Sequence, residues 1–283
     1  MPITTMKITA FQQLACPLDG LPLSKQGSSW RCESGHSYDI ARQGHTHLLP
    51  VQNTRSRNPG DSKEMIDARL RFLNEGFYQP IADALNKIAL ANIPPVASVL
   101  DAGCGEGYYL RQLAAESRPE QTLEILGLDI SKPAILAAAK QDKKMNWIIA
   151  SNANIPVLPK TVDRLICMFG FPVYSEFARI LKSDGQLILI ESGPKHLQEL
   201  REIIYPVLNP QKEKEVVHDG FKTVSTETLA YQIDLTKREF IADLLAMTPH
   251  LFRASAEGKK KAAELRSLSL TVDIKLILLE TET

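Results

Sequence analysis

Three glycines that follow an apolar strand form the part of this sequence best suited to bind a nucleoside cofactor. Val99–Gly107 reads Val-Leu-Asp-Ala-Gly-Cys-Gly-Glu-Gly, so Gly103, Gly105 and Gly107 form a Gly-x-Gly-x-Gly turn. Glycine adopts positive φ and has no Cβ, which lets a ligand approach the backbone closely. The helix expected from about Tyr108 to Ala115 presents its N-terminal amides to that ligand. By itself such a turn fits a dinucleotide site, an S-adenosylmethionine (SAM) site or a plain tight turn.

The acidic residues beside this turn distinguish between the possible ligands. Leu123–Ile130 is a second apolar strand with Asp129 near its end, where a carboxylate can accept both ribose hydroxyls of a nucleoside. A dinucleotide fingerprint has its third glycine three residues after the second, whereas Gly107 follows Gly105 by two. Asp101 precedes the turn, where it would repel a pyrophosphate but suits the cationic methionine end of SAM. The pattern therefore favours SAM over NAD.

The composition sets the frame for these residues. A chain of 283 residues that is 44% hydrophobic can bury one large core and a small additional module. Its apolar runs fall short of the roughly 20 residues that span a bilayer, and the N-terminus lacks a secretory apolar region, so we expect a cytoplasmic protein. The 33 basic and 33 acidic residues balance, and nucleic-acid binding would need a local basic patch.

From residue 97 onward, short apolar strands alternate with helical patterns. This alternation predicts an α/β fold, a parallel sheet with helices on both faces, which in SAM enzymes is the Rossmann-like class I methyltransferase domain, here residues 97–283. The weaker pattern of residues 205–239 predicts an insertion or lid. The expected helices cover residues 134–140, after an N-cap at Ser131, and 177–181. The expected strands are residues 98–101, 124–130, 146–150, 163–168 and 186–191, with a late edge strand over 268–279.

Residues 1–50 predict a different kind of module. Cys16 and Asp19 have C-x2-D spacing, and Cys32 and His36 have C-x3-H spacing. Two such knuckles separated by a strand are the layout of a zinc ribbon, which is too small to fold on hydrophobic burial alone. Zinc prefers thiolate and imidazole, so Asp19 makes a weaker ligand than a cysteine. The alternative is that zinc has been lost and that both cysteines are small buried hydrophobic residues.

The linker and helical segment over residues 51–96 has a local concentration of basic residues. Arg55, Arg57, Arg69 and Arg71 lie between the ribbon and the glycine turn, where a nucleic-acid substrate would lie. Such residues can bind phosphates. They can equally form a solvated linker and helix face, and the residues alone leave both interpretations open.

Several stretches of the chain resemble the bacterial 23S rRNA guanine-N1 methyltransferases. Arg-Ser-Arg-x-Pro-Gly-Asp and Gly-Pro-x-His-Leu are the most specific of them, whereas the glycine turn is shared with many methyltransferases. The resemblance covers most of the chain. The matching stretches are Cys16–Leu23, Gly35–Asp39, Leu48–Gln52, Arg55–Ser62, Phe77–Pro80, Asp101–Tyr109, Gly127–Lys132, Gly193–Leu197 and Met247–Pro249.

This resemblance implies a homodimer that transfers a methyl group from SAM to N1 of a guanine in a hairpin loop of 23S rRNA. It implies zinc ligands at Cys16, Cys32 and His36, with Asp19 standing where the family has cysteine. It also adds Tyr78 and His196 to the cofactor pocket. The expected cofactor-binding set is then Tyr78, Asp101, Gly103, Gly105, Glu106, Gly107, Tyr109, Leu110, Asp129, Asn152 and His196.

The reaction needs the substrate base to be positioned and its N1 proton removed. Phe169 and Phe171 follow the strand over residues 163–168, so either ring can stack on an extruded guanine, or can belong to the core. Glu106 and His196 are expected near the pocket, but His196 can equally hold the SAM carboxylate, and the sequence marks neither residue as the base. Two alternatives remain. One is a small-molecule SAM methyltransferase, and the other is a ribosome-associated RNA-binding protein without turnover.

Overall fold

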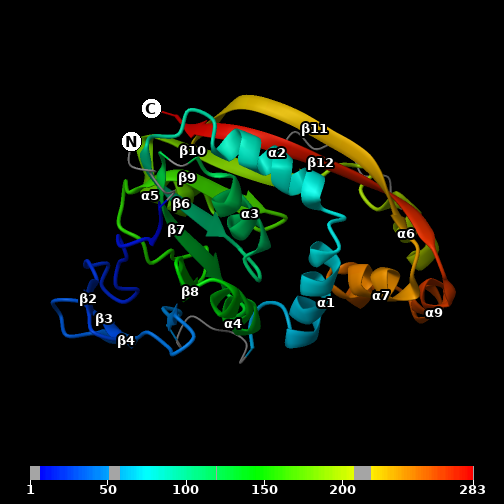
Figure 1. The fold of residues 1–283 in the computed structure, drawn as a ribbon, viewed down its shortest axis with the longest axis horizontal. Coiled ribbons are helices and arrows are strands. Elements are labelled where there is room, and N and C mark those ends of the chain that lie inside the picture. Colours follow the sequence, from blue (N-terminus) through cyan, green and yellow to red (C-terminus); the bar gives the residue numbers. More distant parts are fainter. Residues whose placement is uncertain (1–6, 51–57, 119, 207–217, 283) are drawn as a thin grey trace.

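A mixed β-sheet runs through the centre of the molecule (Figure 1). The computed structural model describes residues 7–50, 58–118, 120–206 and 218–282, and within them this sheet has nine strands in the order β11-β12-β10-β9-β6-β7-β8-β5, with β1 beside β7. The strands are β1 (Lys7–Ala10), β5 (His45–His47), β6 (Val96–Ala102), β7 (Thr122–Asp129), β8 (Asn146–Ile149), β9 (Val162–Met168), β10 (Leu181–Ser192), β11 (Phe221–Leu235) and β12 (Leu268–Thr281).

Helices cover both faces of the sheet, and the alternation of side chains along β6 explains why. Val99 belongs to one buried cluster and Leu100 to the other, because successive residues of a strand point to opposite faces. Strands buried on both faces are typical of parallel sheets with helical crossovers. The helices are α1 (Lys63–Asn74), α2 (Gln79–Ala89), α3 (Tyr108–Glu116), α4 (Lys132–Gln141), α5 (Tyr174–Ile180), α6 (Gln198–Ile204), α7 (Arg238–Ala246), α8 (His250–Arg253) and α9 (Ala256–Glu264).

The α/β fold class and the order of the central elements are confirmed. β6, β7, β8 and β9 pair in parallel, as the alternating pattern predicts. Ser131 is the N-cap of α4, and its hydroxyl accepts a hydrogen bond from the Ala134 amide at 3.2 Å. Pro133 lies in the first turn of that helix, where its missing N–H costs nothing.

Two expectations about the end of the chain are wrong. β12 is an interior strand, antiparallel to β10 on one side and to β11 on the other. The segment expected as an insertion or lid contains β11, a strand of 15 residues that pairs with β12 along its length. The sequence pattern does not reveal β11, because most of its side chains are exposed and many of these are threonine, serine or charged, so its apolar alternation is weak.

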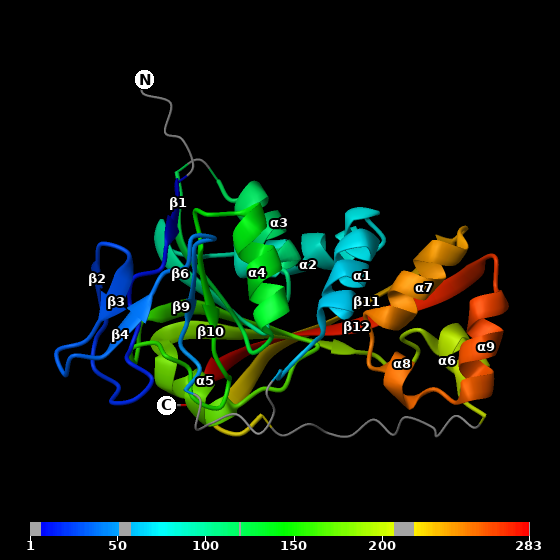
Figure 2. The ribbon, with the colours of Figure 1, turned by 90° about the horizontal axis from the view of Figure 1, so that it is seen from below.

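The first 50 residues divide between two sheets. β2 (Ser24–Gln26), β3 (Ser29–Arg31) and β4 (Ser37–Asp39) form a separate three-stranded sheet, whereas β1 pairs with β7 and β5 pairs with β8. The small sheet and the helices α7 to α9 lie at opposite ends of the molecule (Figure 2). Among the helices described here, none is long and apolar enough to cross a membrane.

Candidate cofactor and metal sites

The glycine turn leads from β6 into α3 and is hydrogen-bonded to the end of β7. The Gly103 and Cys104 amides both donate to the Leu128 carbonyl, at 2.8 and 2.9 Å. Gly103 and Gly105 have φ values of +108° and +56°, in the left-handed region that favours glycine. A Cβ on Gly103 would meet nothing within 4 Å, so this part of the backbone faces open space. The turn therefore has the bare backbone that close approach of a ligand requires.

Asp129 links the turn to the loop after β7. Its Oδ2 accepts a hydrogen bond from the Gly105 amide at 2.9 Å, and its Oδ1 accepts one from the Ser131 amide at 2.8 Å. Burial raises the pKa of this carboxyl, and the two backbone amides act against that rise. Each carboxylate oxygen has a second lone pair, so Asp129 can still accept the two hydroxyls of a ribose.

Two more carboxyls lie beside the turn in buried positions. Asp101 and Glu106 are each 2% exposed, and burial raises both of their pKa values, that of Asp101 far above its ordinary value. Asp101 Oδ1 and Asn152 Oδ1 are buried without a hydrogen-bond partner among the described residues. Unpaired buried oxygens are costly and point to an absent donor. The ammonium and sulfonium groups of SAM are cations that match this set of acidic and amide oxygens, so the residues fit the cofactor.

Aromatic residues form one wall of the site. The His196 ring stacks on Phe169 with centroids 5.9 Å apart and lies 6.4 Å from the Tyr78 ring. Its Nδ1 accepts a hydrogen bond from the Asp273 amide at 3.3 Å, and burial lowers the pKa of His196 to about 4. A neutral imidazole that accepts through Nδ1 carries its proton on Nε2. His196 is therefore a hydrogen-bond donor at neutral pH.

The loop after β9 reaches past this wall. Phe169 has a positive φ of 49° and is 43% exposed, and Phe171 is 89% exposed. Asn152 Nδ2 donates to the carbonyls of Ala102 and Phe171, which ties the loop to the end of β6. Neither ring is buried in the core, so the alternative that one of them is simply a core residue is wrong, and stacking on a base stays a prediction.

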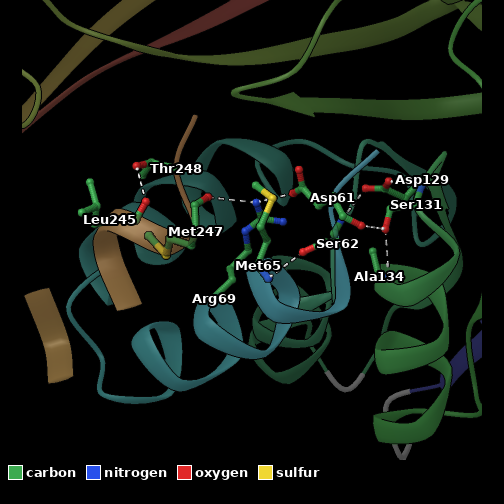
Figure 3. A network of polar contacts seen from close by, with 11 residues as sticks. Asp61, Ser62, Met65, Arg69, Asp129, Ser131, Ala134, Leu245, Met247 and Thr248 are labelled. Carbon is green, nitrogen blue, oxygen red and sulfur yellow. Dashed lines mark hydrogen bonds and ion pairs between the residues drawn. The ribbon is translucent and has the colours of Figure 1, made fainter. Parts of the chain in front are cut away.

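The arginines predicted to bind RNA have different surroundings. Arg71 makes a bidentate ion pair with Asp243 on α7. Arg69 pairs with Asp61 and also donates to the Met247 carbonyl (Figure 3). The Arg69 side chain is mostly buried, whereas the Arg71 side chain remains 62% exposed despite its ion pair, and RNA contact by either stays a prediction. Arg55 and Arg57 lie outside the described residues.

Three members of the expected cofactor set belong to the hydrophobic packing beneath the site. Leu110 is 1% exposed and lies in the core cluster with Trp147. Tyr109 packs against that cluster and meets the Tyr108 ring edge to face. A Cβ on Gly107 would come within 2.5 Å of the Trp147 ring. These residues support the turn through packing, and direct cofactor contact by them stays a prediction.

The four residues predicted to bind zinc do come together. Their ligand atoms all lie within 4.8 Å of one another, and His36 Nδ1 is 3.4 Å from the sulfur of each cysteine and 3.0 Å from Asp19 Oδ2. Cys16 and Cys32 are buried, whereas Asp19 is exposed. Two thiolates, one imidazole and one carboxylate at these separations suit a tetrahedral zinc ion.

Asp273 and Asp61 are site residues that the sequence did not mark. The Asp273 carboxylate accepts from the Lys195 amide at 2.9 Å, and its backbone positions His196. A Cβ on Gly193 would stand 2.4 Å from that carboxylate, which explains the glycine in Gly-Pro-x-His-Leu. Asp273 interrupts the apolar alternation of the late strand, and that interruption was an available signal.

Comparisons with known proteins match both modules. Residues 14–57 match the family model described as "RlmA, N-terminal", and residues 99–185 match a "Methyltransferase domain". A protein from Micromonospora griseorubida, provisionally named a 23S rRNA (guanine-N(1)-)-methyltransferase, is 33% identical over 92% of this chain and 93% of its own. The chain belongs to the family of 23S rRNA guanine-N1 methyltransferases. The resemblance stated from the sequence and the Rossmann-like class I methyltransferase fold are thereby confirmed.

Two further members of the family have similar sequence identity, one over nearly the whole chain and the other over about two thirds of it. YxjB of Bacillus subtilis, which has the same provisional name, is 29% identical over 95% of this chain and 97% of its own. The 23S rRNA (guanine(748)-N(1))-methyltransferase of Streptomyces fradiae is 30% identical over 69% of each chain.

Proposed function

We propose that this protein transfers a methyl group from SAM to N1 of a guanine in 23S rRNA. The observation that carries the proposal is the match to the family relatives over 92–95% of the chain, which includes both the ribbon and the cofactor turn. A small-molecule methyltransferase would need only the second of these. An RNA-binding protein without turnover would have no use for Asp101, Gly103, Gly105 and Asp129 in their intact arrangement.

The chain's own residues bind and orient the two reactants. SAM, when bound, supplies a methyl group already activated on a sulfonium. Asp129 accepts the ribose hydroxyls, and the buried carboxyls of Asp101 and Glu106 favour the cationic end of the cofactor. Much of the rate then comes from holding N1 in line with the methyl group.

The exposed aromatic loop supports recognition of a planar base. Phe169 and Phe171 stand at the edge of the cofactor site and are free to stack on a guanine that has left its helix. The neutral His196 between Phe169 and Tyr78 offers an N–H donor, and its low pKa argues against a role as the base that removes the N1 proton.

A basic hollow supports binding of RNA. It has a volume of about 490 Å³ and is lined by Arg42 and Gln43, from the turn before β5, and by Lys140 and Lys143, at the end of α4. The three cations are exposed, and the described residues provide no ion-pair partner for any of them. Such a surface attracts the phosphate backbone without regard to sequence.

The family resemblance supports three finer parts of the proposal. These are a hairpin loop as the substrate, a homodimer as the active form, and the cytoplasm as the location. The hairpin loop and the homodimer follow from the resemblance of stretches such as Arg55–Ser62 and Gly193–Leu197, and the cytoplasmic location keeps the expectation from the sequence. Each can fail separately from the methyl transfer.

The proposal is tested on rRNA from a strain that lacks the protein and from the same strain complemented with it. Primer extension should stop at one guanine only in the complemented strain, and mass spectrometry should identify N1-methylguanine there. Identical rRNA from the two strains would refute the proposal. Purified protein that binds SAM and the rRNA hairpin but transfers no methyl group would favour the RNA-binding alternative.

A further inference from the structure

Arg69 is the residue of α1 that reaches the cofactor site. Its Nη2 donates to Asp61 Oδ2 at 2.5 Å and to the Met247 carbonyl at 3.2 Å (Figure 3). Asp61 precedes α1, and Met247 follows α7, so parts of the chain far apart in sequence hold one edge of this guanidinium. A guanidinium anchored in this way loses little freedom when it binds a further group.

The other terminal nitrogen of Arg69 faces the glycine turn. A Cβ built on Gly105 would lie 3.3 Å from Nη1, and the Arg69 side chain is the nearest group to that position. Burial raises the pKa values of Glu106 and Asp129, and the positive charge of Arg69 acts against both rises. Arg69 therefore brings a cation to the side of the turn where the carboxyls are gathered.

A second cation near the turn has a different partner. Arg111 Nη1 donates to the Glu106 carbonyl at 2.6 Å and extends from α3, the helix that follows the turn. It caps the backbone of the turn, so its charge is directed to a peptide group. Arg69 is the arginine whose remaining donor faces Gly105.

The charges of SAM complement this arrangement. Its methionine end has an ammonium group and a carboxylate, close to a sulfonium. The buried carboxyls of the site can bind the ammonium and sulfonium groups of SAM. The carboxylate of SAM needs a positively charged hydrogen-bond donor, and arginine is the strongest such donor. We propose that Arg69 binds the methionine carboxylate of SAM, with Asp61 and the Met247 carbonyl holding the guanidinium toward Gly105. This inference rests on the proposed use of SAM.

The same network connects this contact to the ribose side of the site. Ser131 Oγ donates to the Asp61 carbonyl at 2.7 Å, and the Ser131 amide donates to Asp129 (Figure 3). A Cβ on Gly60 would stand 2.9 Å from Ser131, so the segment before α1 lies directly against this loop. The Asp61 carbonyl thus accepts a hydrogen bond from the loop on the ribose side, and the Asp61 carboxylate accepts one from Arg69.

The test compares two ligands that differ in the methionine end. S-adenosylhomocysteine has the amino acid portion, whereas 5′-methylthioadenosine lacks it, and both have the nucleoside. In calorimetric titrations, Arg69→Gln should weaken S-adenosylhomocysteine binding about 10- to 100-fold, the range for a charged hydrogen bond, and should leave 5′-methylthioadenosine binding unchanged. Arg69→Lys should recover part of the loss. Arg71→Gln is the matched control, because Arg71 is on the same helix but pairs with Asp243.

Two results would overturn the proposal. Equal loss of both ligands in Arg69→Gln would assign Arg69 a purely structural role, and unchanged binding of both would remove it from the site. If the unaltered protein binds neither SAM nor S-adenosylhomocysteine, the proposed function itself fails, so the two failures are distinguishable.

Discussion

The carboxyls beside the glycine turn are the residues whose chemistry the sequence predicts best. Asp101 and Asp129 are marked because each ends a strand next to the turn, and the structure brings them to one site with Glu106. Their mutual repulsion is costly without a cation, since burial and neighbouring negative charge both raise the pKa of Asp101. A dicationic ligand end relieves that cost. This explains a site that is acidic in a chain of zero net charge.

Asp129→Ala should weaken SAM binding by about 1.5–3 kcal/mol, the range for a hydrogen bond to a charged group. The ribose hydroxyls lose their acceptor, and the Gly105 and Ser131 amides lose theirs as well. Calorimetry measures the affinity, and circular dichroism verifies that the variant is folded. Unchanged SAM affinity in a folded variant would remove Asp129 from the cofactor site.

His196 should make the stability of the protein depend on pH between about 6.5 and 4. Burial lowers its pKa to about 4, so the unfolded chain binds a proton in this range before the folded chain does. The free energy of unfolding should therefore be fully retained above pH 6.5 and fall as the pH drops to 4, by on the order of 2 kcal/mol.

Urea unfolding of the unaltered protein and of His196→Gln across this range isolates the contribution, because all other groups titrate in both. The difference between the two proteins should shrink as the pH falls. A difference that is constant from pH 7.5 to pH 4 would contradict the assignment.

At the scale of elements, β12 positions the His196 loop, and this could not be predicted. The interior place of β12 depends on pairing with β11, whose exposed threonines and charges conceal a strand. Pairing partners distant in sequence leave no local signal, whereas turn glycines and helix caps do. The same reason applies to Arg69 and Arg71, which lie two residues apart on α1: Arg71 pairs with Asp243 of α7, whereas Arg69 pairs with Asp61 before α1 and reaches the Met247 carbonyl at the end of α7.

Gly193→Ala should displace Asp273 and, with it, His196. The new Cβ would stand 2.4 Å from the Asp273 carboxylate, which holds the Lys195 amide. We expect a loss of about 1–3 kcal/mol in stability, as for other overpacked positions, and weaker SAM binding. Thermal unfolding and SAM titration measure the two effects. Ser192→Ala, at the exposed neighbouring position, serves as the control and should change neither. If Gly193→Ala behaves like Ser192→Ala, Asp273 does not position this loop.

The two knuckles of the ribbon, Cys16 with Asp19 and Cys32 with His36, predict a zinc site in which Asp19 is the weak ligand. Purified protein should contain about one zinc ion per chain, and Asp19→Cys should retain it against higher chelator concentrations, because thiolate is the stronger ligand. Metal analysis after dialysis against a chelator series gives the comparison. Glu33→Cys adds a thiol at an exposed position beside Cys32 and should leave zinc retention unchanged. An ordered ribbon that never contains metal would show that packing of Cys16 and Cys32 replaces the ion.

At the scale of the whole molecule, the ribbon and the helices α7 to α9 occupy opposite ends (Figure 2). The basic hollow lies where the turn before β5 meets the end of α4, near the ribbon end. The chain therefore has a local positive charge at this hollow although its net charge is zero. We propose that the cations of this hollow bind backbone phosphates of the RNA while the aromatic loop binds the base.

The triple variant Arg42→Ala, Lys140→Ala, Lys143→Ala should bind the rRNA hairpin more weakly and with a shallower salt dependence. Each lost phosphate contact reduces the slope of log affinity against log salt by roughly 0.7–0.9. SAM affinity should stay constant, because these residues lie at the far end of α4 from Ser131. The matched control removes the same charge at the other end of the molecule, through Lys259→Ala, Lys260→Ala and Arg266→Ala, all exposed. Filter binding of the rRNA hairpin to both triple variants over a salt series compares their affinities and slopes. Equal slopes for the two variants would mean that net charge alone attracts the RNA and that the hollow contacts no phosphate.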